Sequence, residues 1–140
     1  DAKITIVGPV GTPEDLNNAS VVMKVVYGKN SFLFTGDAEA KSEKQILANG
    51  ADIKADVLKL GHHGSSTSTS EEFLKVVSPS LALISCGKDN DYGHPHKETI
   101  EKLEKYNIPY ERTDIKGTIV VGSDGEHLST AFPDNKTAEK

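Results

Sequence analysis

The strongest constraint on the fold is the regular alternation of short apolar runs with segments of helical pattern. The apolar runs occupy residues 31–35, 57–60 and 81–85. A polar turn follows each run, and a segment with helix-capping residues and an apolar stripe comes next. The three helices are expected near residues 39–49, 70–78 and 95–107. This alternation predicts an α/β fold, in which helices pack on a sheet built largely of parallel strands.

Capping residues indicate where each helix begins. The segments at residues 42–45 and 69–72 fit capping boxes, in which a Ser or Thr is followed three residues later by Glu or Gln. Pro95 suits the first position of the third helix.

Further strands complete the predicted sheet. Residues 4–7 form a short strand, and residues 20–27 pair with residues 31–35 in a hairpin whose loop is residues 28–30. Closing strands are expected at residues 110–113 and 117–121. Because a hairpin contributes an antiparallel pair, we expect a mixed sheet with flanking helices. The domain is predicted to span residues 1–128, and residues 129–140 to form a polar tail or linker.

Composition narrows the functional classes. The 140 residues make up one domain's worth of chain, with 26% charged and 36% hydrophobic residues. A net charge of −5 argues against a broad phosphate-binding surface. No apolar run approaches the ~18 residues of a membrane span, so no membrane contact is expected from this segment. The single cysteine leaves the compartment open, and the start at Asp1 without Met is interpreted as a cut or processed end.

Three polar loops that follow successive strands carry the candidate chemistry. Asp37 lies in the sequence Thr-Gly-Asp-Ala-Glu, His62 and His63 in Gly-His-His-Gly-Ser, and His94 in Tyr-Gly-His-Pro-His. The carboxyl ends of such strands meet at one sheet edge, so Asp37, His62 and His94 are expected to converge. Asp and His are ligands of zinc, manganese and iron. The structural alternatives are a turn or N-cap Asp, a polar loop, and a histidine that caps a helix.

The histidines differ in the roles that their positions predict. On an extended backbone His62 and His63 would point to opposite sides, so one would bind metal and the other would support it through a hydrogen bond. His94 would start a helix, whose dipole disfavours the charged imidazole. His96 is expected to be exposed in the first turn of that helix.

Two further candidates are expected to be structural. His127 is predicted to lie on the surface in a turn-like segment, and Cys86 to be a small buried hydrophobic residue.

The three loop motifs together resemble the metallo-β-lactamase superfamily, most closely the C-terminal hydrolase domain of ComEC-type DNA-internalisation competence proteins. The resemblance covers residues 4–125 and implies the C-terminal half of an αββα sandwich. It implies that Asp37 bridges two metal ions, that His62 is a metal ligand, that His63 supports this ligand or contacts the substrate, and that His94 lies near the substrate and aids catalysis. It further implies an extracytoplasmic location.

The resemblance is incomplete in one respect. The family's H-x-H-x-D-H cluster, which supplies most of the metal ligands, has no counterpart in this chain. The complete domain is expected to hold two zinc ions, with manganese as an alternative, and to hydrolyse phosphodiester bonds of nucleic acid or related esters. This chain alone is expected to bind metal weakly and to be inactive, with the missing N-terminal half as its partner. The competing hypothesis is a non-enzymatic binding or assembly module with incidental histidines.

The missing half also predicts self-association of the isolated chain. Removing one sheet of a two-sheet sandwich exposes an apolar face, and such a face is an association surface. A dimer or higher oligomer is therefore expected. The candidate residues of that face are Val21, Met23, Val25, Leu33 and Leu83.

Overall fold

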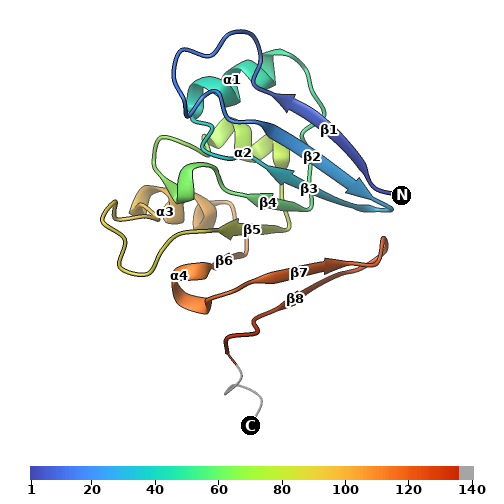
Figure 1. Ribbon diagram of the computed structural model, residues 1–140, viewed down its shortest axis with the longest axis vertical. Helices are drawn as coiled ribbons and strands as arrows, with labels where there is room; N and C mark the ends of the chain where they lie inside the picture. Colours follow the sequence, from blue (N-terminus) through green and yellow to red (C-terminus); the bar gives the residue numbers. More distant parts are fainter. Residues whose placement is uncertain (136–140) are drawn as a thin grey trace.

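A single six-stranded mixed sheet organises the chain in a computed structural model that describes residues 1–135 (Figure 1). The strand order follows the chain, from β1 at one edge to β6 at the other. The first three strands pair antiparallel, whereas β3, β4, β5 and β6 pair parallel, which confirms the predicted mixed sheet. The strands are β1 (Lys3–Gly8), β2 (Val22–Tyr27), β3 (Asn30–Phe34), β4 (Val57–Lys59), β5 (Leu81–Ile84) and β6 (Tyr110–Arg112).

The three predicted helices are present, and each lies in the connection between two neighbouring parallel strands. They are α1 (Ala40–Ala48), α2 (Glu71–Val77) and α3 (Lys97–Lys105). Two shorter helical segments were not predicted, a 3-10 turn η1 (Gly61–Gly64) and α4 (Thr113–Lys116). Among the described residues, no helix has the length and apolar character needed to cross a membrane.

The predicted helix starts need correction. Helix α1 begins at Ala40, so Ser42 is a buried residue inside the helix rather than its cap. Helix α2 is capped by Ser70, whose hydroxyl accepts from the backbone N–H of Phe73 at 3.3 Å. Helix α3 begins at Lys97, and Pro95 therefore lies outside it. Local capping patterns located the helices but missed their first residues; at α1 the side chain of the distant Asn18, rather than that of Ser42, accepts from the backbone N–H groups of Glu39 and Ser42.

The hairpin and the C-terminal region also differ from expectation. The β2–β3 loop has two residues, since Asn30 already pairs with Tyr27. The chain ends in a separate two-stranded sheet of β7 (Val120–Ser123) and β8 (Leu128–Ala131). The prediction of a tail from residue 129 is thus wrong for residues 129–131, where backbone pairing with β7 supplies the order that side-chain periodicity did not reveal. Residues 136–140 of the predicted tail lie outside the described part of the chain.

The main core lies between the sheet and its three long helices. Leu33 and Leu58 lie next to each other on β3 and β4, and both are buried in one apolar cluster with residues from each helix. The helical members of this cluster are Ile46, Phe73, Leu74, Val77 and Leu103. Because strand side chains alternate between faces, this burial assigns the helices to the Leu33 face of the sheet.

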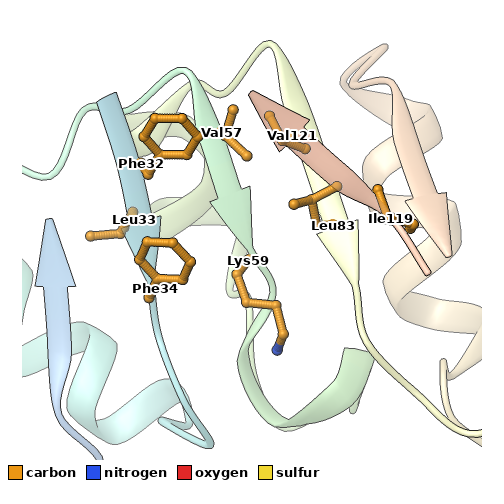
Figure 2. A pocket seen from close by; sticks show the side chains of 8 residues that line it. All are labelled: Phe32, Leu33, Phe34, Val57, Lys59, Leu83, Ile119 and Val121. Atoms are coloured by element: carbon orange, nitrogen blue, oxygen red, sulfur yellow. The ribbon is translucent and has the colours of Figure 1, made fainter. Parts of the chain in front are cut away.

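The opposite face of the sheet is apolar, and its β1 edge is uncovered. Ile4 and Ile6 of β1 are 62% and 59% exposed, and their register partners Val25 and Met23 share this face. Val121 of β7 and Ile119, which precedes β7, help to line an apolar pocket on this face (Figure 2). We call this surface the open face; its residues are Ile4, Ile6, Met23, Val25, Phe32, Phe34, Val57, Lys59, Leu81 and Leu83.

The predicted residues of the uncovered face fall into two groups. Met23, Val25 and Leu83 belong to the open face, and Val21 precedes β2 with 57% of its surface exposed. The prediction is wrong for Leu33, which is fully buried beneath the helices. Its neighbours Phe32 and Phe34 take the open face instead, because alternation along the strand reverses direction at every residue.

A buried carboxylate links helices α1 and α2. Glu43 of α1 is 1% exposed, and its two oxygens accept from the backbone N–H groups of Thr69 at 2.6 Å and Ser70 at 2.8 Å. Burial raises the pKa of Glu43, while these two donors act in the opposite direction. Glu43 therefore fixes the start of α2 against α1.

Replacing Glu43 by Ala should destabilise the fold by about 1–3 kcal/mol, because two buried N–H groups lose their acceptor. The exposed neighbour Lys44 provides the matched control, and Lys44→Ala should change stability by less than about 0.5 kcal/mol. Urea unfolding followed by circular dichroism measures both values. Equal unfolding midpoints for the two variants would contradict the structural role of Glu43.

Candidate metal centre

Three loops meet at one edge of the sheet because they leave adjacent parallel strands. In register, Phe34 of β3 lies beside Lys59 of β4, which lies beside Leu83 of β5. The chain continues from these neighbouring positions into three loops that begin at the same level. The first loop carries Asp37, the second His62 and His63, and the third His94.

Asp37 is placed by a tight turn after β3. Gly36 adopts a positive φ of 54°, and a side chain there would press against Ser20 at 3.0 Å. The backbone N–H of Asp37 donates to the Ser20 hydroxyl at 3.0 Å. The carboxylate is half-buried and lies 3.5 Å, measured from Oδ1, from Nε2 of His63.

The two adjacent histidines do not lie on an extended backbone. Both His62 and His63 have left-handed conformations, with φ values of 48° and 56°, inside η1. The backbone N–H of His62 donates to the Gly36 carbonyl at 2.9 Å, which joins the first and second loops. Their ring centroids are 6.3 Å apart, and each is close to His94. The prediction of opposite directions is therefore wrong, because the left-handed turn brings both rings to the same cluster.

His62 faces a second carboxylate that sequence reasoning did not assign. Its Nδ1 is buried without a hydrogen-bond partner, and the nearest carboxylate oxygen, Oε2 of Glu39, lies 3.6 Å away. Glu39 immediately precedes α1 and also accepts a hydrogen bond of 3.4 Å from Asn17. A carboxylate beside one ring nitrogen is a frequent arrangement for metal-binding histidines. The signal in the sequence was the position of Glu39, two residues after Asp37.

His63 is oriented by the backbone of the neighbouring strand. Its Nδ1–H donates to the carbonyl of Ser85 at 2.7 Å, because a carbonyl only accepts. The neutral ring therefore carries its lone pair on Nε2, the atom that faces Asp37. This ring is ready to bind a metal ion or to accept a proton.

His94 lies at the centre of the aromatic cluster. Its ring centroid is 5.5 Å from those of His62 and Tyr92 and 6.2 Å from that of His63. Asn90 holds the His94 backbone through hydrogen bonds of 2.9 and 2.7 Å. Burial, followed by the neighbouring histidines, lowers the pKa of His94. The predicted helix-dipole cause is wrong, because α3 begins three residues later at Lys97.

His96 is half-buried rather than exposed in a helical turn. Its Nδ1 accepts from the backbone N–H of Ser66 at 2.8 Å, and its Nε2 lies 3.2 Å from the Tyr92 carbonyl. Its ring centroid lies 4.8 Å from that of His94. His96 therefore joins the second and third loops, which corrects the surface assignment. It sits before α3 because tertiary hydrogen bonds hold its ring.

The remaining candidates lie away from the cluster. His127 is exposed in the β7–β8 turn, as predicted. Cys86 is half-buried at the border of the core, rather than fully buried.

Lys59 is a second residue that sequence reasoning missed. It ends β4 on the open face, and its ammonium donates to the Leu60 carbonyl at 2.8 Å. Burial lowers the pKa of Lys59, and the charge of Asp37 opposes this effect. The only signal in the sequence was a charged residue inside an otherwise apolar strand.

The donor set fits part of a metal centre. Asp37 offers a carboxylate, and the rings of His62 and His63 offer imidazole nitrogens, which are ligands that zinc accepts. The buried Nδ1 of His62 without a hydrogen-bond partner indicates a site arranged for more than packing. Within residues 1–135, however, no three His, Cys, Asp or Glu side chains are placed to hold one metal ion together.

Comparison with protein families matches residues 4–88 to the metallo-beta-lactamase superfamily. The chain is 45% identical over 107 residues to "ComE operon protein 3" of Bacillus subtilis and 49% identical over 105 residues to "Recombination protein 2" of Haemophilus influenzae. It is 39% identical over 109 residues to "Competence protein ComA" of Neisseria gonorrhoeae. These matches cover 75–77% of this chain but only 13–16% of the relatives.

The hydrogen bonds predict opposite neutral tautomers for two of the histidines. His63 should carry its proton on Nδ1, because Nδ1 faces a carbonyl. His96 should carry its proton on Nε2, because Nδ1 accepts a backbone N–H. Long-range proton–nitrogen NMR correlations above pH 8 distinguish the two forms. The same tautomer at both positions would contradict this loop arrangement.

Proposed function

This chain belongs to the metallo-β-lactamase superfamily, and from that premise we propose that it supplies half of the metal site of a hydrolase that cleaves phosphodiester bonds. The observation that supports this proposal is the convergence of Asp37 and three histidine rings at the carboxyl edge of the sheet. The likeness to relatives named for competence and recombination supports nucleic acid as the substrate class. The same likeness supports a part in DNA uptake and an extracytoplasmic location.

Asp37 and His62 are the proposed metal ligands. Asp37 would bridge two zinc ions, with manganese as an alternative, and His62 would bind through the ring nitrogen remote from Glu39. A metal pair of this kind supplies a nucleophilic hydroxide at neutral pH and stabilises charge on the phosphoryl oxygens. The neighbouring Glu39 carboxylate would orient the His62 ring and increase its basicity.

His63 and His94 are the proposed substrate and proton-handling residues. The Ser85 carbonyl keeps the His63 lone pair on Nε2, so this ring accepts a proton or a substrate hydrogen bond at the site. Burial and its histidine neighbours lower the pKa of His94. Its place between His62 and Tyr92 puts it within reach of a group bound at the same edge.

The second half of the domain is the proposed partner. A catalytic zinc takes about three protein ligands, and a pair of ions needs more than Asp37 and His62 provide. The chain spans only 13–16% of its relatives, so the remaining ligands are proposed to come from another part of a longer protein. The open face is the surface that this other half would cover. Without it, we propose that the isolated chain pairs with itself through the same face.

Metal binding and turnover test the ligand assignment in the complete protein that contains this chain. Asp37→Ala should lower bound zinc and reduce hydrolysis of a phosphodiester substrate by more than about 100-fold, because a ligand should matter at least as much as the groups that support ligands. His62→Ala should lose more metal than His63→Ala. Asp89→Ala, an exposed carboxylate in the third loop, is the control and should retain both properties. Full metal content and activity in Asp37→Ala would refute the assignment.

Light scattering across a concentration series tests the open face. The isolated chain should form a dimer or higher oligomer, and Phe34→Glu should shift it to monomer by placing a charge on the apolar face. Val76 on α2 is 48% exposed and lies away from this face, so Val76→Glu is the matched control and should leave association unchanged. A monomeric unsubstituted chain at all concentrations would show that the face does not self-associate.

A further inference from the structure

Lys59 is a cation placed on an apolar surface beside the site. Its register neighbours on the open face are Phe34 on one side and Leu83 on the other. Figure 2 shows its side chain running along β4 toward the carboxyl end of the strand, away from the apolar centre of the pocket. The strand continues directly into the turn that holds His62 and His63. The ammonium is therefore directed to the edge where the histidine cluster lies.

The ammonium of Lys59 has hydrogen-bonding capacity left over. It has three donors, and one of them is used by the Leu60 carbonyl at 2.8 Å. Within residues 1–135, no carboxylate comes within ion-pair distance of it. A half-buried charge without an opposite charge is unfavourable, so an anionic group is the partner that this position favours.

Other cations of the chain show what a structural role looks like. Lys24 is also largely buried on the sheet, and its ammonium lies 3.0 Å from the carboxylate of Asp52. Arg112 on β6 donates to both oxygens of Asp114, at 3.0 and 2.7 Å. These charges are satisfied within the fold. Lys59 differs because, within residues 1–135, its side chain is positioned without an opposite charge at ion-pair distance.

We propose that Lys59 is a substrate-binding residue whose ammonium contacts an anionic oxygen of the phosphodiester at the Asp37–histidine edge. This inference deepens the proposed function and rests on it. The edge otherwise presents carboxylates and imidazoles, namely those of Asp37, Glu39 and the histidines. Asp37 and Glu39 repel a negatively charged substrate, and Lys59 supplies a positive charge in addition to that of the proposed metal ions.

The charge of the substrate provides the test. Isothermal titration calorimetry on the complete protein measures the Kd of two thymidine dinucleotides. The charged probe has a phosphorothioate linkage, which resists hydrolysis. The uncharged probe has a methylphosphonate linkage. Lys59→Gln should weaken the charged probe about tenfold or more, the effect of losing a hydrogen bond to a charged group. The uncharged probe should be bound equally by both proteins. Lys59→Arg should keep the Kd of the charged probe within a few-fold.

Lys54 is the matched control, because it precedes β4 at the opposite end of the same strand and is exposed. Lys54→Gln should leave both Kd values unchanged. The inference would be overturned if Lys59→Gln bound the charged probe as tightly as the unsubstituted protein does, or if it bound both probes equally more weakly. It would also be overturned if the unsubstituted protein did not bind the charged probe. If Lys59→Gln fails to fold, the same measurements are made on Lys59→Met, which keeps the apolar stem of the side chain. Unfolding of both variants would assign Lys59 a structural role and reject the inference.

The two proposals fail in different ways. If the complete protein showed no turnover, but Lys59→Gln bound the charged probe alone more weakly, the hydrolase function would be rejected and an anion-binding site would remain. Metal-dependent turnover with unchanged Kd for the charged probe in Lys59→Gln would leave the hydrolase function and reject the role of Lys59.

Discussion

The parallel register of β3, β4 and β5 is the constraint on which the rest of the structure depends. Leu33 and Leu58 lie side by side with Ala82, and all three are buried against the helices. A shift of one residue in one of these strands would turn Leu33, Leu58 or Ala82 away from the core and bring side chains of the opposite face against the helices. Core packing thus fixes the register, and the register fixes the level at which each loop leaves the sheet. The site is a consequence of this packing.

Hydrogen bonds between loops then convert a shared edge into a defined site. The His62 backbone donates to the Gly36 carbonyl, His63 donates to the Ser85 carbonyl, and His96 accepts from Ser66. Each bond joins loops that follow different strands. Because the ring nitrogens of His63 and His96 take part directly, the same bonds that order the loops also decide which nitrogen carries the proton. Loop order and proton position are therefore coupled at this edge.

The two faces of the sheet differ in how far their apolar side chains are buried. The helix face has a continuous core to which α1, α2 and α3 all contribute, and Glu43 adds a buried polar connection between two of them. The open face keeps Ile4 and Ile6 more than half exposed, and Ile119 and Val121 line a pocket on another part of it. The matches cover only 13–16% of the relatives, and the proposal that another part of a longer protein covers this face accounts for the exposed apolar side chains.

The sequence by itself determined the order of elements, the mixed sheet, the family and the loops that carry the chemistry, because alternation, glycine turns and short motifs are local properties. It did not determine the direction of the His62 and His63 rings, which depends on a left-handed turn, or the partners of Glu39, Lys59 and His96. It also gave no signal for β8, whose order comes from pairing with β7. Only the tertiary structure decided these points, because each depends on contacts between segments distant in the chain.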